Sequence, residues 1–479
     1  MKSDALRSHG YETPEAHPGS PAAGASGAVR ERPEPLTLAT VVERFSERFS
    51  RSGELSEEGR SYIPGGYSRN SLTFGPHAIY VDHGQGQYLH TVDGHRLLDC
   101  HNNFSASILG HDHPHVREAM LDLLPRGFSF GNPMQHEHTL ARMLCERIAS
   151  VQQVAFTCSA SEACIAAVRY ARSYTGKSAV AKLEGGYHGL GDEFLFSVHP
   201  LPGLFPGAPT HPAAVPETGG LSAGARDNVV VLPQNDLASS ERILTQNAHR
   251  LSCVIVELQS GAGGVITLDA DYARGLQDLA RTLGILLVVD ETITLRASYH
   301  GLQSAYGIEP DLTVMGKIIG GGLPLGAVGG RADLLGLNED GQVYHSGTHH
   351  GHPLSTIAGI ATLEVLDERT YERLNRHAER IRTELNTWAG ENGYAFFVYG
   401  VGSHLGYGFP DEPGRRYRSC RDILRYTNEE RLQIFAFELA NRGVFPMHRG
   451  QIALSEPMTD ADIDLVIETA KDVVAAIFA

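Results

Sequence analysis

The stretch Thr313-Val-Met-Gly316-Lys317-Ile-Ile-Gly320-Gly-Gly-Leu-Pro324 decides the fold class of this 479-residue chain. It places a lysine after an apolar run and before a group of glycines. A second apolar run, Val288-Val289, ends in Asp290. A lysine in this setting is a candidate to form a Schiff base, and an aspartate at a neighbouring strand end is the partner that a pyridinium nitrogen needs. Together, Lys317 and Asp290 indicate an enzyme that uses pyridoxal 5'-phosphate.

Apolar runs alternate with helical patterns from about residue 150 to residue 330. The runs lie at 154–157, 179–183, 229–232, 253–257, 285–289 and 312–315, and one helix is expected from about 162 to 174. Continuous apolar strands separated by helices predict an α/β fold with a mostly parallel sheet covered on both faces. Ligands of such sheets bind at the carboxyl ends of the strands, which is where Asp290 and Lys317 fall.

The rest of the chain suggests three further regions around this large cofactor-binding domain, which we place at 121–360. Residues 1–35 are rich in Ala, Gly, Pro and Ser and predict a disordered tail. Residues 36–120, with an amphipathic helix near the start and short strands at 78–81 and 96–99, and residues 361–479, which close with a helix capped by Thr459, are expected to form one smaller α+β domain.

Composition limits the classes of partner. The chain has 56 acidic and 40 basic residues, a net charge of −16, which argues against nucleic acid and anionic membranes as partners. Its six cysteines are too sparse for a disulfide scaffold and indicate reduced thiols in the cytoplasm. No run approaches the roughly 18 apolar residues of a membrane span, and the N-terminus has no apolar core of a signal peptide. We expect a cytoplasmic enzyme.

A phosphate group needs a cradle, and Ser159-Ala160-Ser161-Glu162 can supply one between a strand and a helix. Ser159 and Glu162 have the spacing of a capping box. The free N–H groups of the first helical turn and the positive end of the helix dipole suit a dianion. Most capping boxes bind nothing, so this motif gains weight only from its place before Asp290 and Lys317.

Ordered motifs along most of the chain resemble those of class III pyridoxal phosphate-dependent aminotransferases, in the branch of glutamate-1-semialdehyde aminomutases and β-amino-acid aminotransferases. They are Leu109-Gly-His-Asp-His-Pro114, Ser159-Ala-Ser-Glu-Ala163, Glu184-Gly-Gly-Tyr-His-Gly189, Asp290-Glu-Thr292, Pro310-Asp-Leu-Thr313, Gly316-Lys-Ile-Ile-Gly-Gly-Gly322 and Gly347-Thr348. The resemblance implies the pyridoxal phosphate-dependent transferase fold of type I.

The resemblance also implies roles for single residues. Lys317 would bind the cofactor as a Schiff base and carry the proton, and Asp290 would pair with the ring nitrogen. Tyr187 and Thr292 would lie on opposite faces of the ring, although Thr292 stands where the family usually has valine. His188 is expected beside the cofactor.

The same resemblance implies which residues bind the phosphate and that two subunits share the active sites. Backbone groups of Ala160 and Ser161 would bind the phosphate, and Thr348 would reach it from a second subunit of a homodimer with shared active sites. Ala160 replaces the usual glycine, which would crowd this approach. Glu257 is either a residue behind the site or a plain strand-end carboxylate.

The expected substrates are small molecules: an amino acid as donor and an oxo acid as acceptor. Arg69, in Tyr62-Ile-Pro-Gly-Gly-Tyr-Ser-Arg69, resembles the arginine that β-amino-acid aminotransferases present to a carboxylate, and a structural arginine is the alternative. Arg296 is another candidate, unless it joins subunits. An intramolecular aminomutase and a non-catalytic binding protein of the same fold are the alternative functions.

Two groups of histidines superficially resemble metal sites. They are His111, His113 and His115, and His345, His349, His350 and His352. Both coincide with loops of the family, and no Cys or carboxylate of the sequence completes a ligand set. We therefore predict no metal.

Overall fold

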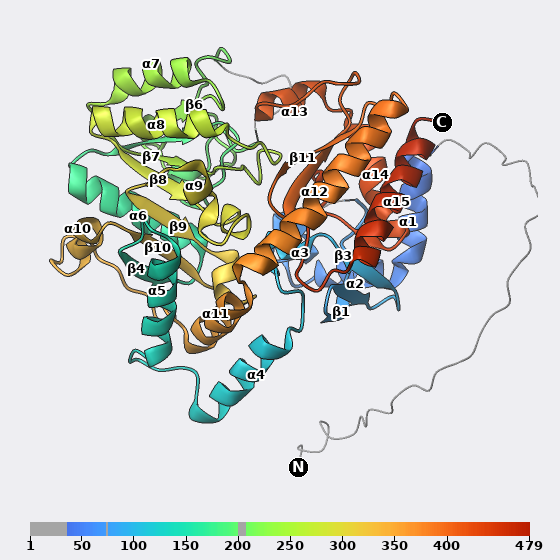
Figure 1. Ribbon diagram of the computed structural model, residues 1–479, viewed down its shortest axis with the longest axis horizontal. Helices are drawn as coiled ribbons and strands as arrows, with labels where there is room; N and C mark the ends of the chain where they lie inside the picture. Colours follow the sequence, from blue (N-terminus) through green and yellow to red (C-terminus); the bar gives the residue numbers. More distant parts are fainter. Residues whose placement is uncertain (1–35, 73–74, 200–206) are drawn as a thin grey trace, which may run out of the picture.

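The computed structural model of the protein describes residues 36–72, 75–199 and 207–479. The tail expected at residues 1–35 lies outside them. The described chain forms two regions side by side, one built by the middle of the chain and a smaller one built by both ends (Figure 1). Within the described residues, no helix has both the length and the apolar composition to cross a membrane.

A seven-stranded sheet forms the centre of the larger region. Its strand order is β4-β10-β9-β8-β7-β5-β6, and all neighbours are parallel except the two pairs made by β10. The strands are β4 (Gln153–Thr157), β5 (Ala179–Leu183), β6 (Val229–Leu232), β7 (Leu251–Val256), β8 (Leu286–Asp290), β9 (Leu312–Met315) and β10 (Gly326–Gly330). The prediction of a mostly parallel sheet is confirmed.

Alternate residues of a central strand pack against opposite layers of helices. Ala181 and Leu183 of β5 belong to the core under α7 (Leu237–Asn247) and α8 (Ala270–Leu283), whereas Val180 belongs to the core under α6 (Ala160–Thr175). Helices thus cover both faces of the sheet (Figure 1). Since neither face meets water, every position of the strand is buried and all but Lys182 are apolar, which explains why mostly apolar runs predict these strands.

The other helices of this region lie at its edges and toward the smaller region. They are α4 (Pro114–Leu123), α5 (Gln135–Arg147), α9 (Gly301–Tyr306), α10 (Ala332–Leu335) and α11 (Pro353–Val365).

Both ends of the chain build the smaller region. β1 (Val81–Gln85), β2 (Tyr88–Thr91) and β3 (Arg96–Asp99) are antiparallel, and β13 (Val444–Phe445) joins them by pairing parallel with β3. This pairing supports the proposal that residues 36–120 and 361–479 form one domain and 121–360 another. A second sheet contains β11 (Phe397–Val401), β12 (His404–Gly408) and β14 (Gln451–Ala453).

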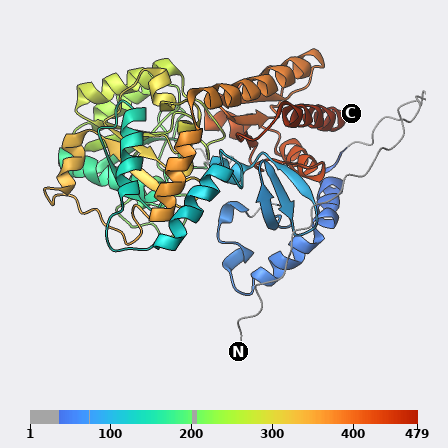
Figure 2. The same cartoon turned by 60° about the horizontal axis from the view of Figure 1, so that its bottom comes forward.

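The helices of the smaller region bring the two ends of the chain together. α1 (Leu38–Arg48) lies against α14 (Glu429–Asn441), with Phe45 and Phe49 fully buried in a cluster with Ile434 (Figures 1 and 2). The remaining helices are α2 (Ser50–Gly59), α3 (Asn102–Ser105), α12 (Glu368–Glu391), α13 (Cys420–Tyr426) and α15 (Asp460–Ile477). The Thr459 cap predicted for α15 is present as a full capping box.

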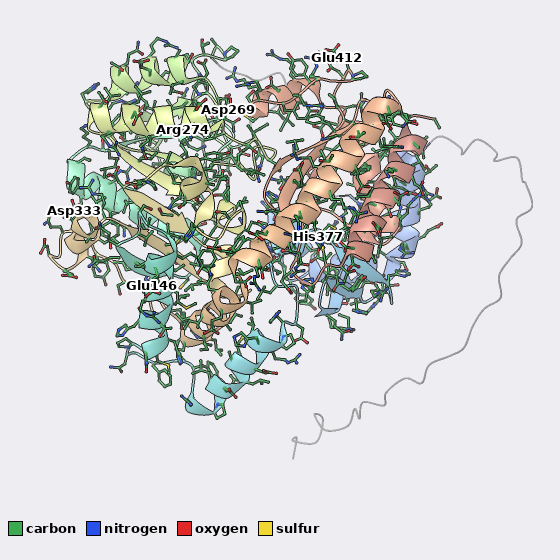
Figure 3. The ribbon with its side chains drawn as sticks, in the orientation of Figure 1. Glu146, Asp269, Arg274, Asp333, His377 and Glu412 are labelled. Carbon is green, nitrogen blue, oxygen red and sulfur yellow. The ribbon has the colours of Figure 1, made fainter. Side chains whose placement is uncertain are left out.

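Charged pairs tie the segment around α13 to the large region. Arg421 Nε donates to Glu184 Oε2 at 2.6 Å and Nη2 to Oε1 at 2.9 Å, and both side chains are buried. Nearby, Arg418 pairs at 2.6 Å with Asp269, which Figure 3 places where α8 begins. Since Glu184 directly precedes Gly185-Gly186-Tyr187, this connection also fixes the loop that carries Tyr187.

Three elements differ from expectation. The strand expected at 78–81 begins only at Val81, because Ala78 and Ile79 pack into the core before it and β1 itself is mostly exposed. Nothing predicted β10, whose residues are Gly-Ala-Val-Gly-Gly, since glycine carries no strand signal. Helix α2 contains mostly Ser, Glu and Gly, which hide its period.

Candidate active site

Asp290, at the carboxyl end of β8, is a buried acid held by several hydrogen bonds. Its side chain is buried and accepts hydrogen bonds from His188 Nδ1 at 2.9 Å and Thr292 N at 3.1 Å. Burial raises the pKa of Asp290, but the bonds from His188 and Thr292 outweigh burial, so the net shift is downward. The carboxylate is therefore kept ionised, as the partner of a protonated ring nitrogen must be.

Lys317 follows the neighbouring strand β9, from which it is separated by Gly316. Its φ of 51° lies in the left-handed region, which is uncommon for a residue other than glycine. Loss of solvation lowers the pKa of Lys317 to about 8, while the charges of Asp290 and Glu257 act in the opposite direction. An amine with this pKa is partly neutral near pH 7 and can act as a nucleophile or a base.

Glu257, just beyond β7, fixes the loop that carries Tyr187. Its Oε2 accepts from Tyr187 N at 2.8 Å and its Oε1 from Gly261 N at 3.1 Å. Burial is the main cause of the raised pKa of Glu257. The Tyr187 ring remains 40% exposed and is free to meet a planar ligand. Glu257 thus acts on the backbone of this loop, and the structure favours the first of the two readings offered for it.

The first turn of α6 forms the expected cradle beside these residues. Ser159 is the N-cap, and its Oγ accepts from Glu162 N at 3.3 Å. The box is not closed, because Glu162 Oε2 accepts from Cys158 N at 2.7 Å instead of from the N-cap. A side chain at Gly189 would begin 2.2 Å from Ser161 Oγ, so the end of the Tyr187 loop touches the cradle.

Ala160 and Thr292 lie on either side of Gly316. A methyl group built on Gly316 would come within 2.9 Å of Ala160 Cβ and 3.4 Å of Thr292 Cγ2. These two departures from the usual family residues therefore meet at one place, next to Lys317.

The residues present fit a pyridine ring with an anionic arm. Thr292 Oγ1 is buried and, within the described part of the chain, has no hydrogen-bond partner, which leaves a polar atom to meet a ligand. The ionised Asp290 suits a protonated ring nitrogen, the exposed Tyr187 ring suits stacking, and the N-terminus of α6 suits a phosphate. Pyridoxal phosphate has all three features.

Two predicted site residues are exposed. Thr348 is on the loop before α11, and His350 of the same loop lies beside the cradle, with its Nε2 3.8 Å from Glu162 Oε2. Arg69 is exposed, its Nη1 donates to Asn103 Oδ1 at 3.1 Å, and its guanidinium lies over the Phe104 ring with its Cζ 5.4 Å from the centroid.

The turn that supports Arg69 is strained. Asn102, Asn103, Phe104 and Ser105 all have positive φ, between 45° and 70°. Each such residue costs about 1–2 kcal/mol, so other contacts must hold the turn. Asp99 Oδ1 accepts from His101 N and Asn102 N, each at 2.9 Å.

Arg296 also holds this turn, and its proposed role as a carboxylate reader is wrong. Its side chain is 1% exposed, Nη1 donates to Ser105 O and Nε to Ser403 Oγ, both at 3.0 Å, and Nη2 donates to Leu454 O. Burial lowers the pKa of Arg296 to about 9. It joins segments within one chain, and its Nε, Nη1 and Nη2 all donate to protein oxygens.

Contrary to expectation, a cysteine and a carboxylate do lie beside one of the histidine groups. Cys158 and Glu162 do lie with His350, with ligand atoms within 4.8 Å of one another, and Cys164, His188 and Asp290 form a second such group. Folding brought these residues together from segments that the sequence keeps apart. Glu162 already accepts from Cys158 N, and His188 and Asp290 bind one another, so we assign neither group to a metal.

Two residues of the site carried no sequence signal that we used. Cys164 Sγ lies 3.5 Å from Asp290 Oδ2, and its position one turn into α6 could have suggested it. The second is Arg449, in the turn before β14. Burial raises the pKa of the Tyr187 phenol, and the positive charge of Arg449 opposes that rise. Only the tertiary fold brings Arg449 to the Tyr187 loop.

Comparisons with known proteins agree with this geometry. The model of the family described as aminotransferase class-III matches residues 71–474. A protein named glutamate-1-semialdehyde 2,1-aminomutase 2 from Geobacillus kaustophilus is 35% identical over 437 residues, which cover 89% of this chain and 98% of that protein.

Solved structures are similar over the same length. An omega-transaminase from Sphaerobacter thermophilus superposes with a TM-score of 0.85 at 33% identity, covering 89% of this chain and 98% of that one. A β-phenylalanine aminotransferase from Variovorax paradoxus gives 0.82 at 31% identity, covering 91% and 96%. These likenesses confirm the predicted pyridoxal phosphate-dependent transferase fold of type I. The chain belongs to the class III aminotransferases, a family of pyridoxal phosphate-dependent enzymes.

Proposed function

We propose that this enzyme moves an amino group between an amino acid and an oxo acid, with pyridoxal phosphate as cofactor and Lys317 and Asp290 as catalytic residues. One arrangement carries the proposal. An amine whose pKa is about 8 follows β9, and a buried, ionised carboxylate ends the adjacent parallel strand β8. This combination suits a Schiff-base lysine and a ring-nitrogen acid.

Each residue then has a defined task. Lys317 would hold the cofactor, and its neutral amine would take the proton from the substrate carbon. Asp290 keeps the ring nitrogen protonated, and His188 keeps Asp290 in place and ionised. The bound cofactor supplies the electron sink for this chemistry.

The remaining groups hold the cofactor. Tyr187 and Thr292 would contact its ring, Glu257 fixes the Tyr187 loop, and Ser159, Ala160 and Ser161 would bind its phosphate. Gly189 lets the loop touch the cradle, so cofactor binding depends on both segments.

The amino donor carries a carboxylate that Arg69 binds, and β-amino acids are one class that this arrangement suits. The guanidinium is exposed and held by Asn103 and Phe104, so its direction is fixed while donors remain for a ligand. A relative named as a β-phenylalanine aminotransferase supports the choice.

An intramolecular aminomutase is the second candidate, because the relative from Geobacillus kaustophilus bears that name. A panel of α-, β- and ω-amino donors, each assayed with and without added oxo acid, distinguishes the two functions. Turnover that requires the oxo acid supports the transaminase. Turnover of an amino aldehyde alone supports the aminomutase, and no reaction with any donor contradicts both.

We also propose a homodimer with shared active sites. Large apolar side chains are exposed around α4 and on the loop before α11: Leu121, Leu124, Phe128, Phe130 and Tyr344. Tyr344 is 79% exposed and lies four residues before Thr348, so a partner that covers Tyr344 would receive Thr348 as well. Size-exclusion chromatography with light scattering tests the dimer.

The cytoplasm is the proposed location. All six cysteines are free, and four of them are buried, which suits a reducing compartment.

A further inference from the structure

We propose that His199 and Glu217 are positioning residues that hold the guanidinium of Arg449 for a carboxylate of the substrate. The inference rests on the proposed function insofar as the substrates are amino and oxo acids. What it adds is the pair of side chains that orients the guanidinium of Arg449.

The three residues form a chain of hydrogen bonds. Glu217 Oε2 accepts from His199 N at 3.0 Å, and Glu217 Oε1 is 2.7 Å from His199 Nδ1. His199 Nε2 lies 2.8 Å from Arg449 Nη1. Glu217 thus binds both the backbone and the ring of His199, and the other side of the ring faces the arginine.

These contacts determine the tautomer of His199. The guanidinium has only donors, so His199 Nε2 must accept from Arg449, and Nδ1 must then carry the proton that Glu217 accepts. The bonds from His199 lower the pKa of Glu217 by more than burial raises it, so Glu217 stays ionised. An ionised Glu217 therefore selects the tautomer that holds Arg449.

Because the His199 imidazole is neutral, it binds Arg449 without neutralising the positive charge of the guanidinium. Among the described residues, no carboxylate lies within 4.0 Å of the Arg449 guanidinium, whereas many other arginines of the chain pair directly with an acid. An imidazole fixes one N–H and leaves the positive charge and the other donors for a ligand.

Arg449 lies near the loop that carries Tyr187. Burial raises the pKa of the Tyr187 phenol, and the positive charge of Arg449 opposes that rise. Gln451, two residues on, donates to Gly261 O at 2.8 Å, and Gly261 N donates to Glu257, which also holds Tyr187. The turn of Arg449 is therefore tied to the Tyr187 loop.

The surroundings indicate what else a ligand would contact. His199 and Arg449 line a cavity of about 590 Å³ whose apolar lining includes Val198, Ile423 and Phe445. A carboxylate attached to an apolar body fits a guanidinium beside such a surface.

The test measures binding to the holoenzyme by calorimetry, with 3-phenylpropionate and its neutral amide as probes. The ratio of the two affinities reports the interaction with charge and cancels the contact of the phenyl group. Wild type should bind the acid more tightly. His199→Leu should lower the ratio about tenfold, the loss of one well-oriented charge-assisted contact.

Conservative variants separate positioning from stability. His199→Gln should restore most of the ratio, because its amide can donate to Glu217 and accept from Arg449. Glu217→Gln should lower the ratio, since an amide no longer selects the tautomer. In an Arg449→Met background, His199→Leu should have no further effect on the ratio.

His211→Leu is the matched control, because His211 Nδ1 contacts Arg242 Nη1 at 3.3 Å and does not line the cavity. Its ratio should equal that of wild type. A wild type that binds acid and amide equally, an unchanged ratio in His199→Leu, or an equal loss in the His211 control would overturn the inference. Absence of transamination by wild type with the binding results intact would overturn the proposed function alone.

Discussion

The rate at which the apoenzyme takes up pyridoxal phosphate should rise with pH through a midpoint near 8. Only the neutral form of Lys317 attacks the cofactor, and loss of solvation lowers the pKa of Lys317 from 10.5 to about 8. At pH 7 this leaves about a tenth of the amines neutral, roughly 300-fold more than for an ordinary lysine. Removing the charge of Asp290, which raises the pKa of Lys317, should move the midpoint to lower pH in Asp290→Asn.

The assay follows initial uptake by absorbance from pH 6 to 10. Dividing by the rate of methoxyamine, which stays neutral over this pH range, removes the titration of the cofactor itself. Asp236→Asn is a matched control, because Asp236 caps α7 and asparagine caps equally well. A midpoint near 10 in wild type, or an upward shift in Asp290→Asn, would refute the reasoning.

Four further predictions follow from other residues. Lys317→Ala should lose turnover and borohydride-stable attachment of the cofactor, with the unfolding midpoint little changed. Thr348→Val should weaken cofactor retention in equilibrium dialysis, and dilution to monomers should abolish activity, because the threonine serves the partner subunit. Arg69→Ala should lower kcat/KM for the carboxylate-bearing donor about tenfold to a hundredfold, the worth of a bidentate contact, with Arg69→Lys rescuing only in part. Glu184→Gln should destabilise the fold by about 3 kcal/mol in urea, since the buried guanidinium of Arg421 loses the negative charge that accepts from its Nε and Nη2, and adding Arg421→Met should recover most of the loss.

Each of these has a result that contradicts it. Activity in Lys317→Ala would end the assignment of the catalytic lysine, and a fully active monomer would exclude the role of Thr348. Wild-type kinetics in both Arg69 variants would make Arg449 the sole carboxylate reader. A Glu184→Gln protein as stable as wild type would mean that water reaches the buried pair.

The strands of the parallel sheet could be predicted because nearly all of their residues are buried and apolar. β5, β6 and β9 are buried at every position and are apolar at all positions except Lys182 and Thr313, so their boundaries follow from short, mostly apolar runs. β10 consists largely of glycine and is held in place by its two neighbours, which a sequence of one strand does not contain. Its position therefore follows from tertiary structure.

The candidate site divides in the same way. Asp290 and Lys317 could be predicted because their chemistry needs a particular residue type at the end of a strand. Arg296 also follows a strand, but its carbonyl partners come from residues 105 and 454, so its burial could not be read locally. Arg449 and His199 are 250 residues apart in the sequence, and no spacing rule connects them.

The parallel pairing of β13 with β3 has a consequence for synthesis on the ribosome. Leu98 finds its partner Val444 only after almost the whole chain has been translated. The cofactor-binding sheet, by contrast, is complete in sequence once β10 has been made. Until α14 emerges, Phe45 and Phe49 lack the residues that bury them, and such apolar side chains are what chaperones bind. Helix α1 is thus translated before the cofactor-binding sheet but buried only after it, and a chain that stopped before α14 would leave Phe45 and Phe49 without the residues that cover them.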